Sequence, residues 1–200
     1  MSGSSGSRAS KKQTVSTSPT SKKRPRKNAS RPSSGSAKRG SETLHLNDDW
    51  NEFLRVLTST GTRYLLIGGH ALAVHAQPRF TEDLDVFVQP SLANAKRLHS
   101  ALVEFGFGSV IPEAAELAKP GLVWMLGRKP RRIDILTGIS GVTFAQAQRD
   151  SVTVTVVDTR VPVIGREALI RNKIASARPK DLADVAMLGA PHVRAKRRRR

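Results

Sequence analysis

The sequence predicts a mixed α/β fold, of α/β or α+β class, in which a mixed sheet is flanked by helices. Short apolar runs that alternate with period two indicate strands, and other segments repeat their apolar residues at helical spacing. The two kinds of segment are interspersed along the chain, which is typical of folds that layer helices against a sheet. We assign this fold to residues 44–190, a length sufficient for one hydrophobic core.

The first part of this domain contains a helix, a strand and a second helix. Asn47 or Asp48 caps the first helix, apolar residues follow at helical spacing, and Gly61 ends it. Residues 64–67 form a short apolar strand that runs into two glycines. Residues 71–76 form the second helix, which stops before a proline.

The middle of the domain contains three strands and one longer helix. Asp83–Val88 alternates with period two, as a strand does. A helix with a serine cap covers 91–104. Residues 122–126 and 132–136 form a strand pair joined by the polar turn 127–131.

The last part of the domain contains two strands and two helices. Residues 152–157 alternate valine and threonine, and a further strand covers 161–164. Helices over 166–177 and 179–188 complete the domain. Pro179 suits the first turn of the last helix.

Both ends of the chain are basic and poor in apolar residues. Residues 1–41 contain eleven Lys or Arg, residues 194–200 contain six, and neither segment contains an acid, so the body between them is nearly neutral. Such segments cannot bury enough apolar surface to offset the entropy of ordering them, and we expect 1–43 and 191–200 to be disordered basic tails. The tails either keep the protein soluble or contact the phosphate backbone of a nucleic acid.

The composition excludes several classes of protein. The chain has no cysteine, which excludes disulfides and thiolate metal sites. No apolar run approaches the roughly 20 residues of a membrane span, and the N-terminus lacks the apolar segment of a secretory signal. We therefore expect a soluble, cytoplasmic protein with no membrane partner.

Two glycines form the first part of a candidate site. Gly68 and Gly69 connect the strand 64–67 to the helix that follows, and the N-terminus of that helix presents backbone N–H groups and a positive dipole end. Because glycine has no Cβ, a phosphate group can approach this backbone closely.

Three aspartates form the second part of the candidate site. Asp83 and Asp85 lie two residues apart on one strand and therefore share a face. Asp134 lies among aliphatic residues in a strand that we expect beside the first. Carboxylates this close raise each other's pKa unless a cation lies between them, and oxygen ligands suit Mg²⁺. The sequence therefore predicts a magnesium site.

The glycines and aspartates belong to motifs that resemble a known family. Gly-Gly-x-Ala-Leu-Ala at 68–73 and Arg-x-Thr-x-Asp-Leu-Asp at 79–85 are similar to the core of the nucleotidyltransferase superfamily that includes DNA polymerase beta. The segments 169–175 and 178–184 resemble the C-terminal helical motif of the minimal bacterial members of AbiEii type, several of which are toxins of toxin–antitoxin pairs. The resemblance covers roughly residues 64–188 and implies a nucleotidyltransferase-like sheet.

The resemblance also implies a role for each residue of the site. Gly68 and Gly69 form the turn that binds the nucleotide phosphates, and the three aspartates are catalytic and hold two Mg²⁺ ions between them. The metal ligands are Asp83, Asp85 and Asp134. Supporting or phosphate-facing roles fall to Arg79, Thr81 and Lys173.

The activity implied by the resemblance is the Mg-dependent transfer of a nucleoside monophosphate from a nucleoside triphosphate, such as ATP, to an acceptor hydroxyl of RNA or protein. An antitoxin protein is an implied partner. The alternative is a catalytically inactive protein of the same fold that binds nucleotide or nucleic acid through its basic tails.

Two features of the sequence remain open to more than one interpretation. The basic turn 127–131 is either a solvated hairpin tip or a guide for an anionic acceptor. Asp181 and Asp184 either match the dipole of their helix or pair with Arg178 and Lys180.

Overall fold

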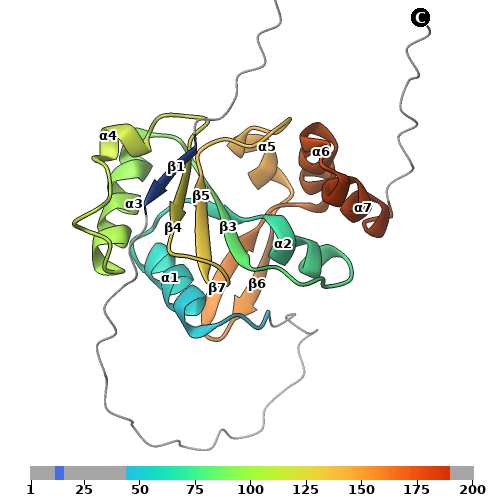
Figure 1. The fold of residues 1–200 in the computed structure, drawn as a ribbon, viewed down its shortest axis with the longest axis horizontal. Coiled ribbons are helices and arrows are strands. Elements are labelled where there is room, and N and C mark those ends of the chain that lie inside the picture. The colour runs from blue at the N-terminus through green and yellow to red at the C-terminus, as the bar shows by residue number, and fades with distance from the viewer. Residues whose placement is uncertain (1–11, 16–43, 190–200) are drawn as a thin grey trace, which may run out of the picture.

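The computed structural model describes residues 12–15 and 44–189 of the chain (Figure 1). The strands of these residues are β1 (Lys12–Val15), β2 (Tyr64–Leu66), β3 (Asp83–Val88), β4 (Val123–Leu126), β5 (Arg132–Leu136), β6 (Val152–Val156) and β7 (Thr159–Val163). The helices are α1 (Asp48–Ser59), α2 (Gly68–His75), α3 (Leu92–Glu104), α4 (Ala114–Leu117), α5 (Phe144–Arg149), α6 (Arg166–Ser176) and α7 (Pro179–Met187).

The strands form one mixed sheet in the order β1-β4-β5-β3-β2-β7-β6. At its centre β3 runs parallel to β5 and antiparallel to β2. Figure 1 places α3 and α4 at one end of the molecule and α6 and α7 at the other. The predicted mixed sheet flanked by helices is therefore confirmed.

Polar caps begin the helices where the sequence predicts them. The Asn47 side chain accepts a hydrogen bond from the Trp50 backbone N–H at 3.0 Å, so Asn47 and not Asp48 is the cap of α1. Ser91 caps α3 by accepting from the Asn94 backbone N–H at 3.4 Å. These side chains satisfy N–H groups that have no partner within the helix.

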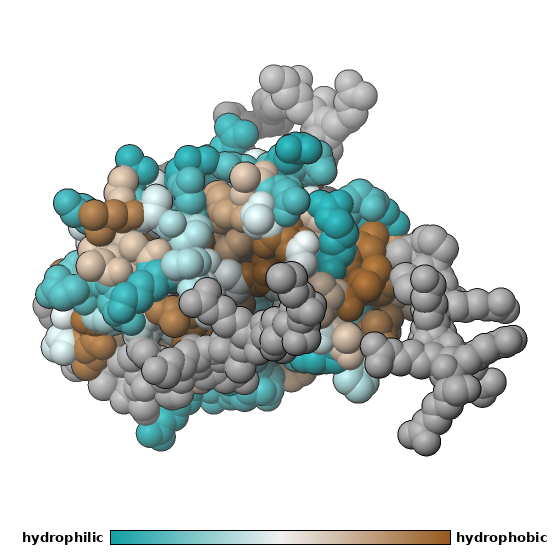
Figure 2. All heavy atoms as spheres, turned by 90° about the horizontal axis from the view of Figure 1, so that it is seen from above, coloured by the Kyte–Doolittle hydropathy of each residue, from teal (hydrophilic) through white to brown (hydrophobic). Residues whose placement is uncertain are grey.

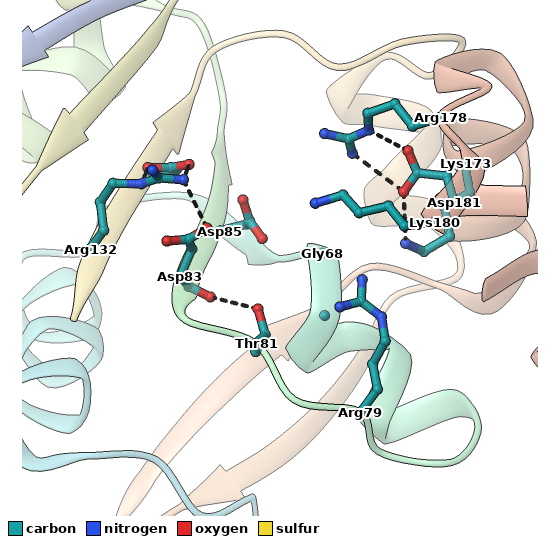
Figure 3. Close-up of a pocket in the computed structure, with 12 residues that line it drawn as sticks. Gly68, Arg79, Thr81, Asp83, Asp85, Arg132, Lys173, Arg178, Lys180 and Asp181 are labelled. Carbon is teal, nitrogen blue, oxygen red and sulfur yellow. Dashed lines mark hydrogen bonds and ion pairs between the residues drawn. The ribbon is translucent and has the colours of Figure 1, made fainter. Parts of the chain in front are cut away.

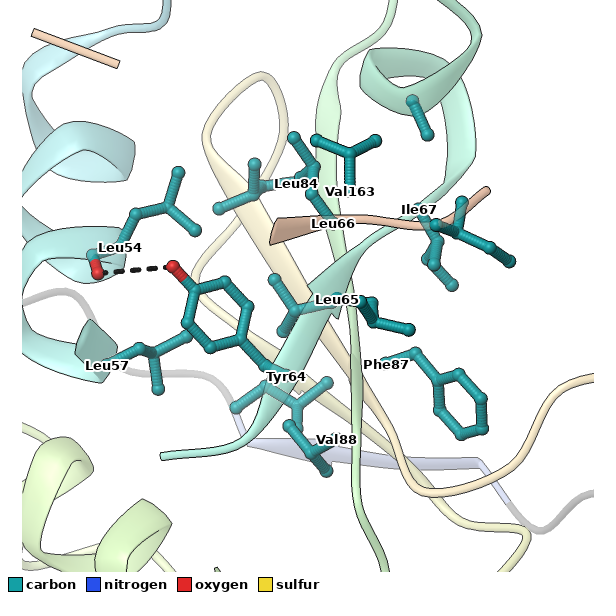
Figure 4. Close-up of a cluster of buried hydrophobic side chains, with 14 of the residues drawn as sticks. Leu54, Leu57, Tyr64, Leu65, Leu66, Ile67, Leu84, Phe87, Val88 and Val163 are labelled. Atoms are coloured by element: carbon teal, nitrogen blue, oxygen red, sulfur yellow. Dashed lines mark hydrogen bonds between the residues drawn. The ribbon is translucent and has the colours of Figure 1, made fainter. Parts of the chain in front are cut away.

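The hydrophobic core packs helix side chains against the central strands. All three residues of β2 are buried, because both faces of the sheet are covered at this strand. In Figure 4, Leu54 and Leu57 of α1 lie beside Tyr64, whose hydroxyl reaches the Leu54 carbonyl at 3.5 Å. Leu84 of β3 and Val163 of β7 belong to the same buried cluster. This core fixes the central strands that carry the candidate site.

The helix predicted over 71–76 begins earlier than the sequence indicated. It starts at Gly68, so both glycines lie in its first turn rather than in a loop before it. Gly68 has a φ of +68°, a conformation that favours glycine. The helices α4 and α5 are not predicted from the sequence because they are too short for an apolar period to be recognised.

A strand also forms within the segment predicted to be a disordered tail. Residues 12–15 pair in parallel with β4, from Lys12 opposite Val123 to Val15 opposite Leu126. This departs from the prediction for 1–43, because backbone hydrogen bonds can hold an edge strand without a large apolar side-chain surface. The rest of the two tails lies outside the described residues, and the domain limits remain a prediction.

The surface combines hydrophilic side chains with small hydrophobic patches, as the face in Figure 2 shows. The large hydrophobic residues that are most exposed are Phe80 and Val157. Among the described residues, no helix is both long enough and apolar enough to pass through a bilayer.

Candidate functional site

The three predicted aspartates meet on one face of two adjacent strands. Because β3 and β5 are parallel neighbours in register, Asp85 lies opposite Asp134 and Asp83 lies opposite Arg132. Alternate residues of a strand point to the same face, so the three carboxylates and the Arg132 guanidinium share one side of the sheet. The predicted convergence of Asp134 with Asp83 and Asp85 is therefore present.

A polar pocket opens over these aspartates (Figure 3). It is lined by all the site residues predicted from the sequence: Gly68, Gly69, Arg79, Thr81, Asp83, Asp85, Asp134 and Lys173. Four further residues line it that the prediction did not include: Arg132, Arg178, Lys180 and Asp181. The sheet and α2 form one side of the pocket, and α6 and α7 form the other.

Arg132 connects two of the three carboxylates. Its Nε donates to Asp134 Oδ1 at 2.8 Å, and its Nη2 donates to Asp134 Oδ2 at 3.0 Å and to Asp83 Oδ2 at 2.8 Å. The second oxygen of Asp83, Oδ1, is buried and has no hydrogen-bond partner among the described residues. Charge-assisted bidentate contacts of this kind are strong and hold both partners in a fixed geometry.

Asp85 has no such guanidinium contact, and its electrostatic environment is unfavourable to a negative charge. Burial, and then the charges of Asp134 and Asp83, raise the pKa of Asp85 to about 6, while Lys180 and Arg178 act in the opposite direction. A negative charge on Asp85 is therefore unfavourable at neutral pH, and a cation bound beside it would relieve this.

The two glycines allow α2 to approach the aspartates. A Cβ on Gly68 would overlap the carboxylate of Asp85, and a Cβ on Gly69 would lie 2.9 Å from Cβ of Thr81. Thr81 in turn donates to the backbone carbonyl of Asp83 at 3.3 Å. No side chain caps the N-terminus of α2, where Ile67 is the cap residue. The backbone of α2 thus reaches the pocket without an intervening side chain.

Arg79 and Lys173 are both bound by acids of α7. Arg79 forms a bidentate pair with Asp184, with Nε–Oδ1 at 2.8 Å and Nη2–Oδ2 at 2.9 Å. Lys173 is buried and donates to Asp184 Oδ2 at 2.6 Å and to Asp181 Oδ1 at 3.4 Å. Burial alone would raise the pKa of Asp184, but the hydrogen bonds from Arg79 and Lys173 outweigh it and lower the pKa. Of the two roles predicted for these cations, the contacts favour the supporting one.

Besides Arg132, the cations of the pocket that the sequence did not predict are Arg178 and Lys180. Arg178 is the cap residue of α7 and pairs with Asp181, while Lys180 forms no ion pair with a described residue. In Figure 3 the Lys180 side chain extends from α7 toward Asp85. Cations at the positive end of a helix are electrostatically unfavourable unless an anion is bound nearby, and this was the signal available in the sequence.

The donor set fits a divalent cation, although no cage for one is preassembled. Three carboxylates are the hard oxygen ligands that Mg²⁺ prefers, and the unpartnered Oδ1 of Asp83 and the raised pKa of Asp85 both indicate missing positive charge. Within residues 12–15 and 44–189, however, no three acidic or imidazole groups are already arranged to hold a metal ion. Arg132 instead occupies the oxygens of Asp134 and one oxygen of Asp83.

Comparison with known proteins gives a family match that spans most of the chain. A family model described as "Nucleotidyl transferase AbiEii toxin, Type IV TA system" matches residues 53–198. Among solved structures, an antigenic nucleotidyltransferase-like protein from Paracoccidioides brasiliensis is similar at 18% identity and a TM-score of 0.47, over 69% of this chain and 72% of that chain. No curated protein sequence matches.

Replacing Gly68 with alanine should damage the site more than the same change at Gly61. Both glycines have positive φ, of +68° and +65°, but only a Cβ on Gly68 meets another group, the carboxylate of Asp85. We expect Gly61→Ala to lower the free energy of unfolding by about 1 kcal/mol and Gly68→Ala to lower it by about 3 kcal/mol. Urea denaturation measures both values. Equal losses would show that Asp85 does not pack against Gly68.

Replacing Asp85 with asparagine should stabilise the metal-free protein at neutral pH. The pKa of Asp85 is raised from 3.8 to about 6 in the folded protein, so its ionisation opposes folding as the pH rises through 6. Asp85→Asn should increase the free energy of unfolding by about 2 kcal/mol at pH 7.5, and the gain should disappear by pH 4.

The control for this prediction is Glu52→Gln, which removes an exposed carboxylate 3.8 Å from Arg55 on α1. Its effect should stay within about 0.5 kcal/mol at both pH values. A gain for Asp85→Asn that persists unchanged at pH 4 would contradict the electrostatic explanation. Denaturation with urea in the presence of EDTA is the measurement.

Proposed function

Because the chain belongs to the AbiEii family of nucleotidyl transferase toxins, we propose that it transfers a nucleoside monophosphate from a nucleoside triphosphate to a hydroxyl group of RNA. The observation that carries this proposal is the register of β3 and β5, which groups the three carboxylates beside the glycine start of α2. Asp83, Asp85 and Asp134 supply oxygen ligands for a metal ion, and the N-terminus of α2 supplies backbone N–H groups for a phosphate.

The three aspartates are the residues that would hold two Mg²⁺ ions. Asp85 and Asp134 face each other across the strands, and Asp83 adds its buried, unpartnered Oδ1. When bound, Mg²⁺ lowers the pKa of an acceptor hydroxyl and offsets the charge that develops on a transferring phosphate. The protein's own contribution is to keep the three carboxylates on a rigid sheet, where their positions depend on backbone pairing.

The α2 N-terminus and two cations of α7 would bind the phosphates. Gly68 and Gly69 leave the backbone open to the pocket, and no side chain competes for the first N–H groups. Lys180 and Arg178 face the same pocket from the opposite side, and their charges act on Asp85 across it. A polyanion bound between these elements would neutralise cations that now lie at the positive end of α7.

Arg79 and Lys173 support this arrangement without contacting the phosphates. Arg79 joins the segment between α2 and β3 to Asp184 of α7, and Lys173 joins α6 to the same carboxylate. Because both cations bind the buried carboxylate of Asp184, they keep α6 and α7 next to the segment that leads into β3. Removing any member would leave a buried charge without its partner.

The charge around the pocket favours RNA as the acceptor. Lys129, from the turn between β4 and β5, lies 4.0 Å from Asp83 Oδ2 and pairs with Glu82 at 2.8 Å. This turn and the start of α7 place basic side chains on two sides of the aspartates, and the chain ends add seventeen further Lys and Arg residues. RNA carries its hydroxyl groups on a negatively charged phosphate backbone, which such a basic surface attracts.

The family also supports a place in a toxin–antitoxin pair. Its description names a toxin of a type IV system, and such a toxin requires an antitoxin that restrains it. We propose that transfer to RNA is the toxic activity of this chain. Growth arrest and transfer should then be lost together when the carboxylates are changed.

Transfer should depend on divalent metal and on Asp134. With Mg²⁺ and each of the four α-³²P-labelled nucleoside triphosphates, the wild-type protein should label total cellular RNA. EDTA or Asp134→Asn should reduce labelling at least 100-fold, since a metal ligand is lost. Expression in bacteria should arrest growth for the wild type only. Labelled protein in place of RNA would overturn the choice of acceptor, and binding of triphosphate with no transfer would overturn the activity.

Lys180→Ala should weaken nucleotide binding more than a matched change elsewhere. Lys96, an exposed lysine of α3, provides the control because Lys96→Ala removes the same charge away from the pocket. We expect the KM for the triphosphate to rise about tenfold in Lys180→Ala, with a smaller fall in kcat. Titration with a non-hydrolysable triphosphate should show the same difference. Equal KM values for the two variants would remove Lys180 from the phosphate site.

A further inference from the structure

The Arg132 guanidinium lies between two of the three aspartates of the pocket. Three of its contacts are hydrogen bonds of 2.8–3.0 Å to Asp83 and Asp134, which lie on two different strands. Its side chain is 25% exposed, and the carboxylates that it holds are 19% and 12% exposed. Arg132 is thus a shielded cation that links the two strands through their acids.

The contacts of Arg132 involve the same oxygens that a metal ion needs. Both oxygens of Asp134 and one oxygen of Asp83 accept hydrogen bonds from the guanidinium. A divalent cation at these oxygens would lie within a few ångströms of a charge of the same sign, in a partly buried site where screening by solvent is weak. The guanidinium and the metal therefore exclude each other from the shared oxygens.

We propose that Arg132 is a positioning residue that stands in for the divalent cation, holding Asp83 and Asp134 together in the metal-free protein and leaving them when metal binds. This inference rests on the proposed function, since it assumes that the aspartates bind metal. Without the guanidinium, three carboxylates on two adjacent strands would repel one another with no cation between Asp83 and Asp134. With the guanidinium, Asp83 and Asp134 stay close together in the metal-free protein.

The long arginine side chain can withdraw without disturbing the sheet. Arg132 is the first residue of β5, and its backbone position opposite Asp83 is held by the strand pairing. Its side chain already reaches the solvent, so release requires rotation of the side chain alone. A metal ion can therefore reach the carboxylates, but its binding is weakened by the free energy needed to break the contacts of Arg132.

A purely structural role for Arg132 makes the opposite prediction for metal affinity. If the guanidinium only orients the ligands, its removal weakens metal binding, because the carboxylates lose their arrangement. If it competes with the metal, its removal strengthens metal binding while it destabilises the metal-free protein. The direction of the change in affinity thus separates the two roles.

The experiment compares Arg132→Gln with Arg131→Gln in the full-length protein. Arg131 is the neighbouring residue, pairs with Asp49 at 3.1 Å and does not line the pocket, so its substitution removes the same charge from nearly the same place. Mn²⁺ is titrated calorimetrically at pH 7.5 without nucleotide, and thermal unfolding is measured with EDTA and with saturating Mn²⁺.

We expect Arg132→Gln to bind Mn²⁺ at least tenfold more tightly than the wild type, with a lower Tm in EDTA and a larger rise in Tm on adding Mn²⁺. Arg131→Gln should match the wild type within about twofold. Arg132→Lys, which keeps a charge but cannot contact both carboxylates in the same way, should fall between the wild type and Arg132→Gln. It also serves as the test if Arg132→Gln does not fold.

Weaker or unchanged Mn²⁺ binding by the Arg132 variants would overturn the inference and leave the proposed function standing. Equal tightening in Arg131→Gln would also overturn it, because long-range charge would then explain the effect. If no protein binds Mn²⁺, the inference fails, and labelling of RNA by the wild type then decides separately whether the proposed function survives.

Discussion

The parallel register of β3 and β5 is the constraint on which the site depends. One hydrogen-bonded ladder sets Asp85 opposite Asp134 and Asp83 opposite Arg132. A shift by one residue would turn one strand's acids to the other face and separate them, because strand side chains alternate. The ladder is held by core residues on both sides of the central strands, so the hydrophobic core brings like charges together against their repulsion. The repulsion involves only the three carboxylates, whereas the hydrophobic packing that outweighs it extends through the domain.

The cations of the site divide into those that are already neutralised and those that face the pocket. Asp184 binds Arg79 and Lys173, and these contacts connect the segment after α2 to α6 and α7. This buried cluster sets the distance between the two sides of the pocket. Lys180 lies in the first turn of α7, lines the pocket and has no ion pair among the described residues. The cations that hold α6 and α7 in place therefore differ from Lys180, which is not paired with an acid within residues 12–15 and 44–189.

The sequence predicted much of the fold and the grouping of the aspartates, for identifiable reasons. Period-two alternation placed β3 at its observed bounds, the polar turn 127–131 placed β5, and polar caps placed α1 and α3. The start of α2 was not predicted, because its first two residues are glycines, which have no side chain to contribute to an apolar pattern. The partners of Arg79 and Lys173 could not be predicted, since their contacts with Asp184 depend on how α7 packs, 105 and 11 residues farther along the chain. Roles assigned to individual residues remain predictions.

The edge strand β1 determines where the N-terminal segment joins the domain. Because β1 is parallel to β4, Val15 lies beside Leu126, at the end of the sheet where β5 begins with Arg132 and β3 begins with Asp83. In the sheet order, β1 lies at the edge and pairs with the outer side of β4, whose other side pairs with β5. The backbone N–H and C=O groups on that side of β4 would otherwise be unpaired and could pair with a strand of another molecule, so β1 protects the sheet from edge-to-edge aggregation.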